Sequence, residues 1–173
     1  ESDNVGLFGY TGTTSPYDLH LESVDIVGRN NVGSMIGKAM REKFPNEHFP
    51  LSHNISATGT VRGYSNVGGL YGCQSGSRSR ITNSFSAVDV IGFSEGEVNI
   101  GGVVGLSDGS EYISNSYASG SVTAVGMGRN VGGLIGFANK SYSVYTNCYS
   151  RAKVIGGENT GGLIGAVKSG NAK

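Results

Sequence analysis

The sequence lacks several features that would narrow its class at once. It has no tryptophan, three prolines and two cysteines among its 173 residues. Cys73 and Cys148 show no metal-ligand spacing and fall at different points of the repeats described below, so we expect two separate small thiols rather than a zinc site or a disulfide. No apolar run approaches the ~20 residues of a membrane-spanning helix. We therefore predict no transmembrane segment.

Neither sign of charge is in excess. Thirteen Lys and Arg residues balance thirteen Asp and Glu residues. Because no basic stripe is present that would neutralise phosphates, we expect no nucleic-acid partner. Glycine, in contrast, is abundant, with 30 residues. Disordered chains are poor in β-branched and aromatic residues, whereas Val, Ile, Tyr and Phe recur here at regular intervals. The composition therefore predicts an ordered β protein punctuated by glycine.

A glycine-centred phrase that begins with Asn recurs six times. Its copies are NVGLFG at 4–9, NVGSMIG at 31–37, NVGGLYG at 66–72, NIGGVVG at 99–105, NVGGLIG at 130–136 and NTGGLIG at 159–165. Successive final glycines are 28, 35, 33, 31 and 29 residues apart. A period of this length indicates stacked supersecondary units, each contacting its neighbours.

A second phrase lies between the copies and alternates apolar with polar residues, which is the period of a half-buried strand. It reads ITNSFSAVDVIG at 81–92, ISNSYASGSVTAVG at 113–126 and YTNCYSRAKVIG at 145–156, with looser versions at 19–28 and 52–63. We expect an inward aromatic set with one looser equivalent, and a valine set stacked at the strand end. These sets are Phe85, Tyr117, Tyr149 and Ile55, and Val90, Val122 and Val154.

Together the two phrases predict an all-β fold, a parallel and right-handed β-solenoid of about five to six coils. Residues 1–173 form one domain in this interpretation, with an insertion at 38–50 that forms a loop or a short helix. Asn66, Asn99 and Asn130 suit a tight turn or an amide ladder. The glycines let neighbouring backbones approach closely, and those of the four clearest copies are Gly68, Gly69, Gly72, Gly101, Gly102, Gly105, Gly132, Gly133, Gly136, Gly161, Gly162 and Gly165.

The G-G-L-[IVY]-G core, the Asn-Val before it and the N-S-[YF] strand after it resemble the GLUG-motif family. The similarity covers nearly the whole chain and is strongest at 66–165. The resemblance implies a repeat region of a large bacterial surface or secreted protein, such as a haemagglutinin-like adhesin or the stalk of an immunoglobulin A-cleaving metallopeptidase. It thus implies an extracellular location and a structural or adhesive role. It carries over no catalytic residue, because the motif is structural.

Two regions are candidate binding surfaces for a host or environmental glycan or protein. The insertion at 38–50 is charged and free of glycine, and insertions in solenoids often form the binding face; its candidates are Lys38, Arg41, Lys43 and Phe44. The alternative for this segment is a tolerated surface loop. An aromatic strip for carbohydrate stacking would contain Tyr112, Tyr142, Tyr145 and Phe137, although such residues also occur as core or ladder.

The search for reactive groups predicts no catalytic residue, no metal site and no cofactor. Glu47-His48 and His53 have the wrong order for a zinc-protease helix. The segment Asp108–Glu111 is an isolated acidic turn, with an accidental calcium site as its alternative. The alternative function is a polysaccharide-active β-helix enzyme, a hydrolase or lyase using paired carboxylates. Asp25 and Asp89 are the nearest approach to such a pair, with their coils two apart, roughly 10 Å along the axis.

The two ends of a solenoid expose strand edges that invite pairing. No polar cap is evident at either end of this sequence. We therefore expect flanking domains in a parent protein, or end-to-end self-association of the isolated chain.

Overall fold

The computed structural model describes residues 2–12, 15–41, 51–94, 96, 98–139 and 143–168. These residues form strands and turns, with no helix among them and hence none long and apolar enough to cross a membrane. The strands are β1 (Phe8–Thr11), β2 (Tyr17–Val27), β3 (Asn30–Gly33), β4 (Ile36–Arg41), β5 (Leu51–Gly63), β6 (Ser65–Gly68), β7 (Tyr71–Thr82), β8 (Phe85–Ser94), β9 (Asn99–Gly101), β10 (Val104–Ser114), β11 (Tyr117–Ser119), β12 (Ser121–Gly126), β13 (Asn130–Gly132), β14 (Ile135–Ala138), β15 (Val144–Thr146), β16 (Tyr149–Ser150), β17 (Lys153–Ile155), β18 (Thr160–Gly161) and β19 (Ile164–Val167).

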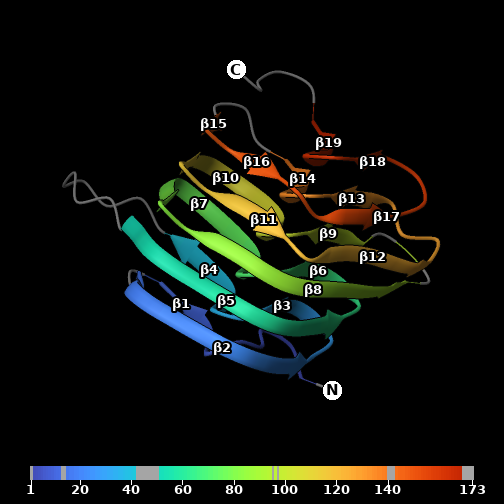
Figure 1. The fold of residues 1–173 in the computed structure, drawn as a ribbon, viewed down its shortest axis with the longest axis horizontal. Coiled ribbons are helices and arrows are strands. Elements are labelled where there is room, and N and C mark those ends of the chain that lie inside the picture. The colour runs from blue at the N-terminus through green and yellow to red at the C-terminus, as the bar shows by residue number, and fades with distance from the viewer. Residues whose placement is uncertain are drawn as a thin grey trace.

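Each coil contains three strands, as in the unit β6, β7 and β8. Every strand pairs in parallel with the equivalent strand of the next coil, about 30 residues away in sequence. The short strands form one sheet in the order β18-β13-β9-β6-β3, and the other two walls form a second, continuous sheet. The coils rise in chain order, so the N- and C-terminal ends lie at opposite ends of the stack (Figure 1). The predicted parallel β-solenoid is therefore confirmed.

The core is built from columns of apolar side chains, one from each coil. Val32, Val67, Ile100 and Val131 follow one another in the short-strand sheet and are fully buried. A second column holds Val61, Val90, Val122 and Val154, of which the first three are fully buried. The predicted stacking of Val90, Val122 and Val154 is thus confirmed. Burial of these columns, at about 25 cal/mol per Å² of apolar surface, drives the stacking.

The glycines of the repeated phrase occupy places where backbone contacts backbone. An added Cβ on Gly68 would lie 2.0 Å from the carbonyl oxygen of Tyr71, and one on Gly105 would lie 2.6 Å from the amide nitrogen of Val67 in the preceding coil. The second glycine of the pair meets both the backbone of the next coil and the third wall of its own coil. A Cβ on Gly102 would lie 2.6 Å from the Ala118 Cβ. The core is therefore only one small side chain thick at this corner, which is why glycine recurs there.

Asparagines form the tight turns between strands, as predicted for Asn66. Its φ is 53°, and Asn31 and Asn159 have φ values of 54° and 52°. The corner between the second and third strands of a coil has the same conformation, with φ of 51° at Asn83 and 49° at Asn115. Asn is among the few residues other than glycine that tolerate this left-handed region. The coil that contains Asn66 and Asn83 therefore bends at two left-handed asparagine corners and one glycine corner, whereas Asn99 and Asn130 are not among the residues with positive φ.

The aromatic set of the third strand points outward, so the prediction that Phe85, Tyr117 and Tyr149 face the core is wrong. Their neighbours Ser86 and Ala118 are fully buried instead, because the glycine corner opposite leaves room only for small side chains. The register pairs Phe85 with Ser56, so the buried Ile55 is not their equivalent.

The start of the insertion also differs from its prediction. Lys38 to Arg41 belong to strand β4 rather than to a helix, because their backbone pairs with β1 on one side and β7 on the other. Residues 42–50 lie outside the described part of the chain.

Because the core at this corner is one small side chain thick, we predict that equivalent glycines differ sharply in the unfolding free energy lost on substitution by alanine. Gly102→Ala places a Cβ 2.2 Å from the Gly133 carbonyl oxygen and 2.6 Å from the Ala118 Cβ, so we expect a loss of about 3 kcal/mol of unfolding free energy from overpacking. Gly162→Ala is the matched control, since nothing lies within 4 Å of its added Cβ, and its effect should stay within about 0.5 kcal/mol. Urea unfolding of both variants measures this difference. Equal effects would contradict the described packing of the corner.

Candidate functional site

The most regular exposed surface is the outer face of the third wall, which we call the ladder face. It is formed by β2, β5, β8, β11 with β12, and β16 with β17. Equivalent side chains stand in columns across these strands, about 4.8 Å apart. One column contains His20, Ser56, Phe85, Tyr117 and Tyr149. A second contains Asp25, Thr60, Asp89, Ser121 and Lys153.

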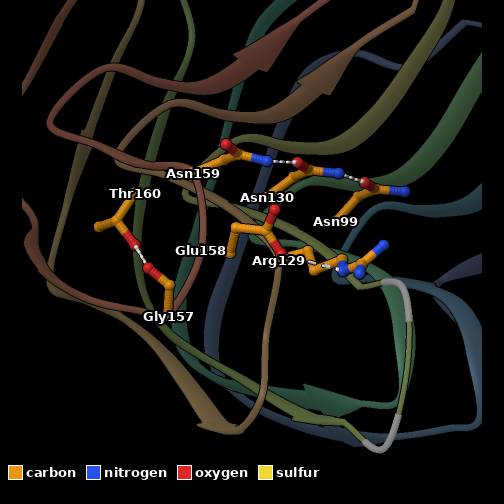
Figure 2. A network of polar contacts seen from close by, with 7 residues as sticks. All are labelled: Asn99, Arg129, Asn130, Gly157, Glu158, Asn159 and Thr160. Atoms are coloured by element: carbon orange, nitrogen blue, oxygen red, sulfur yellow. Dashed lines mark hydrogen bonds and ion pairs between the residues drawn. The ribbon is translucent and has the colours of Figure 1, made fainter.

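The first asparagine of the repeated phrase forms an unbroken amide ladder along one corner. The Nδ2 of Asn31 donates to Oδ1 of Asn4 at 2.8 Å, and Asn66 donates likewise to Asn31 at 2.9 Å. Asn99, Asn130 and Asn159 continue the series with distances of 2.7, 2.8 and 3.1 Å. Figure 2 shows the C-terminal end of this ladder, with Asn99, Asn130 and Asn159. Every bond runs in the same direction, from one coil to the preceding one, which confirms the predicted ladder.

Next to this ladder, the last two coils are joined by an exposed ion pair. Arg129 Nε lies 3.2 Å from Glu158 Oε2 (Figure 2). The Thr160 hydroxyl donates to the Gly157 carbonyl at 3.1 Å in the turn that precedes the last short strand. Both side chains of the ion pair are about half exposed, so the pair contributes little to stability and mainly fixes the turns against each other.

The corner that borders the ladder face carries a second ladder. Asn115 donates to Asn83 at 3.0 Å and Asn147 donates to Asn115 at 3.1 Å. Toward the N-terminal end of the same corner, Asn54 donates to Asp18 Oδ1 at 2.7 Å. The Nδ2 of Asn83 lies 3.5 Å from the Nδ1 of His53, so the Asn83–Asn115–Asn147 ladder and the Asn54–Asp18 pair are separate.

The aromatic column of the ladder face is a parallel stack. The rings of Phe85 and Tyr117 are 5.1 Å apart with 6° between their planes, and those of Tyr117 and Tyr149 are 4.9 Å apart with 4° between them. The Arg151 guanidinium lies over the Tyr149 ring, 5.4 Å from its centroid. Since the rings cover one another, they present edges rather than faces to the solvent. This stack stabilises the coils and is poorly suited to stacking on a sugar ring.

The wall formed by β4, β7 and β10 carries the predicted binding residues that the structure describes. Lys38 and Tyr112 both lie on its outer side, but Lys38 aligns with Leu106, six residues from Tyr112 along β10, roughly 20 Å away. Tyr112 is 39% exposed, with the Arg80 guanidinium 5.6 Å from its ring centroid. Arg41 belongs to β4. The remaining candidates Lys43, Phe44 and Tyr142 lie outside the described residues.

The predicted aromatic strip is not a single surface. The hydroxyl of Tyr145 is buried, and the pKa of this phenol is raised by burial, so Tyr145 faces the interior. Phe137 lies half-buried beside Leu106. The register pairs Tyr112 with Val144 and the buried Ile113 with Tyr145, so the two tyrosines lie on opposite faces of the wall.

Sequence reasoning missed a polar cluster inside the same wall. Glu111 is fully buried, and neither carboxyl oxygen has a hydrogen-bond partner among the described residues. Ser79 aligns with Glu111 and Gln74 aligns with Ser107; all four side chains are buried and carry an unpaired oxygen. Burial raises the pKa of the Glu111 carboxyl to about 7, and the nearby Ser107 hydroxyl only partly offsets this. An acid with this pKa exchanges its proton near neutrality.

The carboxylates considered for hydrolysis are engaged separately. Asp25 pairs with Arg62, and Asp89 accepts from Ser121 at 2.7 Å. Thr60 stands between the two aspartates in their column. Asp108 and Glu111 lie on opposite sides of their strand, since Asp108 is half-exposed and Glu111 is buried, so they do not share a calcium ion.

The cysteine thiols and the histidine imidazoles likewise take part in the packing and hydrogen bonding of the fold. Cys73 and Cys148 are free, and burial raises the pKa of Cys73 to about 11, which keeps its thiol protonated and unreactive. His20 contacts the Ser56 hydroxyl at 2.7 Å, and His53 contacts that of Thr82 at 3.0 Å. In the described part of the chain, no three His, Cys, Asp or Glu side chains gather as metal ligands would.

These features define a β-solenoid repeat protein, and comparison with known proteins identifies where similar sequences occur. The chain is 36% identical over 155 residues to halomucin of Haloquadratum walsbyi, a match that covers 82% of this chain and 2% of halomucin. It is 28% identical over 128 residues to an immunoglobulin A1 protease of Streptococcus pneumoniae, and 27% identical over 121 residues to one of Streptococcus sanguinis. These two matches cover 73% and 69% of this chain, and 6% of each protease.

The matched regions are therefore small parts of large surface or secreted proteins. No family model matches the chain, so the GLUG assignment stays a resemblance. No solved structure matches it either.

The first asparagine ladder predicts that an acid cannot replace an amide in its middle. Asn99→Asp keeps the acceptor for Asn130 but loses the donor to Asn66, so we expect a loss of about 1–2 kcal/mol at neutral pH. This loss should shrink as the carboxyl is protonated near pH 4. Asn99→Ala should lose a similar amount with no such pH dependence. Thermal unfolding at pH 3.5 and pH 7 separates the two, and identical pH profiles would contradict a donor role for Asn99.

Because Glu111 is a buried acid, we predict that its contribution to the stability of the fold falls with rising pH. The folded-state pKa of Glu111, about 7, lies above its ordinary value of 4.5, so the unfolded chain releases this proton at lower pH than the folded chain. The contribution of Glu111 is fully present below pH 4.5, declines from there to pH 7, and is lost above it. Glu111→Gln removes this decline. We expect Glu111→Gln to gain stability relative to the wild type between pH 4.5 and pH 8 in urea unfolding; parallel profiles would contradict the raised pKa.

Proposed function

We propose that this chain is a structural repeat module of an extracellular or cell-surface protein, one that presents a binding surface and catalyses no reaction itself. The observation that carries the proposal is the amide ladder from Asn4 to Asn159. Such a series is built coil by coil from equivalent residues. The module's regular side chains are engaged with neighbouring coils, which suits a rod that separates or displays other parts of a protein.

The relatives support the location and the modular role. Most of this chain is similar to a region that makes up 2% to 6% of each relative. A sequence used as a small part of large surface or secreted proteins fits a repeat region better than a complete enzyme. The adhesive role, the bacterial origin and the membership of the GLUG-motif family are parts of this proposal.

The outer side of the β4–β7–β10 wall is the better binding surface of the two. On the ladder face the aromatic rings cover one another. Tyr112, in contrast, is exposed beside Arg80, and an amphipathic ring next to a guanidinium offers both an apolar surface and hydrogen-bond donors. Lys38 adds a cation to the same wall. This combination supports a glycan or a polar protein surface as the partner.

A glycan array probed with the purified chain, with and without calcium, tests the binding role. We expect a saccharide ligand whose affinity falls at least 5-fold in Tyr112→Ala combined with Lys38→Ala. Thr123→Ala on the ladder face is the control and should bind as the wild type does.

Two results would contradict the proposal. Absence of binding to the array and to a panel of extracellular proteins would leave only a spacer. Cleavage of a polysaccharide by the purified chain would replace the module by the hydrolase or lyase considered above.

A further inference from the structure

The interior of the stack changes from apolar to polar where the pairing of β7 with β10 shifts register. The shift lies between Gly109 and Glu111, and Gly76, which aligns with Gly109, has a φ of 106°. Ser107 precedes the shift and Glu111 follows it, and both side chains are fully buried. The Ser107 hydroxyl is close enough to the Glu111 carboxyl to lower its pKa against the larger effect of burial. The two side chains therefore face one interior space.

Five side chains from successive coils bring oxygen atoms to this space, and we call them the inner oxygen cluster. They are Gln74 and Ser79 of β7, Ser107 and Glu111 of β10, and Tyr145 of β15. The carbonyl oxygen of Gln74, the three hydroxyl oxygens and both carboxyl oxygens of Glu111 are buried without a hydrogen-bond partner. The Tyr145 phenol lies near enough to Glu111 and Ser107 for both to act on its pKa, after the larger effect of burial.

This cluster lacks positive charge as well as hydrogen-bond donors. The Gln74 carbonyl and an ionised Glu111 carboxylate can only accept hydrogen bonds. Among the buried residues that the structure describes, Glu111 is the one charged side chain, and none is Lys or Arg. Buried water could donate hydrogen bonds to these atoms, but it would leave the carboxylate without a counter-charge, which is costly in the interior. The missing partner is therefore a cation.

We propose that the inner oxygen cluster binds one alkali-metal cation, Na⁺ or K⁺, held by Glu111 and the neighbouring neutral oxygens. All the candidate ligand atoms are oxygens, which hard cations prefer, and none is nitrogen or sulfur. A single positive charge neutralises the single carboxylate. A divalent ion such as Ca²⁺ would instead leave an excess charge buried among neutral groups. The sequence does not reveal this site, because its oxygens come from different coils and include only one acid.

Binding of the cation is linked to folding. The cluster exists only when successive coils are stacked, so the cation binds the folded chain and not the unfolded one. The folded state must then gain stability as the free cation concentration rises. Above the dissociation constant, each tenfold rise in free cation should lower the unfolding equilibrium constant by about tenfold.

Urea unfolding of the full chain in different chloride salts at constant ionic strength tests the site. At pH 8 the Glu111 carboxyl, with a pKa of about 7, is ionised. The reference salt is tetramethylammonium chloride, because the methyl groups of this cation keep its charge away from the oxygens. When Na⁺ or K⁺ replaces it, we expect the unfolding equilibrium constant to fall by about 5-fold or more. The pH dependence predicted above for Glu111 belongs to the cation-free fold and is measured in the reference salt.

Three variants separate this site from a general effect of salt. Glu111→Gln keeps the shape of the side chain but removes its charge, so its unfolding should be the same in all of these salts. Gln74→Met removes the amide oxygen at nearly constant volume and should weaken the response to the cation. Asp108→Asn is the matched control, because Asp108 is half-exposed on the other side of the same strand; it should respond as the wild type does. Circular dichroism confirms that each variant is folded.

The proposal is overturned if the wild type unfolds alike in all three salts, or if Glu111→Gln responds to Na⁺ or K⁺ as the wild type does. Either result would leave the cluster to ordered water alone. A stronger response to Ca²⁺ than to both alkali ions would overturn the choice of a monovalent cation. These results are independent of the proposed binding role, because that surface lies on the outer side of the wall and its ligand is measured separately.

Discussion

The parallel stacking of one coil on the next, at about 4.8 Å, is the constraint on which the rest of this structure depends. At that spacing the backbone of each corner contacts the backbone of its neighbour, and no side chain fits between them. A Cβ on Gly72 would lie 2.3 Å from the Val32 amide nitrogen, and one on Gly105 would lie 2.6 Å from that of Val67, each in the preceding coil. The second glycine of the pair contacts the next coil in the same way and, in addition, meets the third wall of its own coil at Ser86 or Ala118. The glycines of the repeated phrase thus allow close backbone contact between coils and close packing between the walls of one coil.

The same spacing decides which side chains can occupy an exposed column. Equivalent residues stand next to one another, so a side chain must tolerate its own copy as a neighbour. An amide does, because it contains both a donor and an acceptor, and aromatic rings do by stacking. Like charges do not. In the column of the ladder face that contains aspartates, Thr60 separates Asp25 from Asp89, and Ser121 separates Asp89 from Lys153.

Much of this architecture could be predicted from the sequence, because the six glycine phrases and the alternating strands each have one structural solution. Which face of the third strand turns toward the core could not be predicted in this way. Alternation shows that Phe85 and Ser86 lie on opposite sides, but intuition places the aromatic residue inside. Only the thinness of the core opposite Gly69 makes the serine the inner residue. Serine, alanine and serine at 86, 118 and 150 were the available signal.

The candidate surfaces were harder to predict for similar reasons. Tyr112 and Tyr145 belong to adjacent coils, and their faces depend on the register of β10 and β15, which pairs Tyr145 with Ile113 rather than with Tyr112. Lys38 to Arg41 read as a helix because charged residues favour one, but the strands on either side supply partners for their backbone. Glu111 gave no signal, because a single acid in an alternating strand is usually exposed.

The coil is also the natural unit of change in this molecule. Among the described residues, the strands of each coil pair only with strands of the coil before and the coil after it. The intervals between final glycines vary from 28 to 35 residues without altering the corners. A gene encoding such a stack can gain or lose one whole coil and leave every remaining contact intact, whereas a single added methyl group at a corner disturbs two coils at once. Length is therefore the property that can vary most freely in such a protein, and sequence at the corners the least.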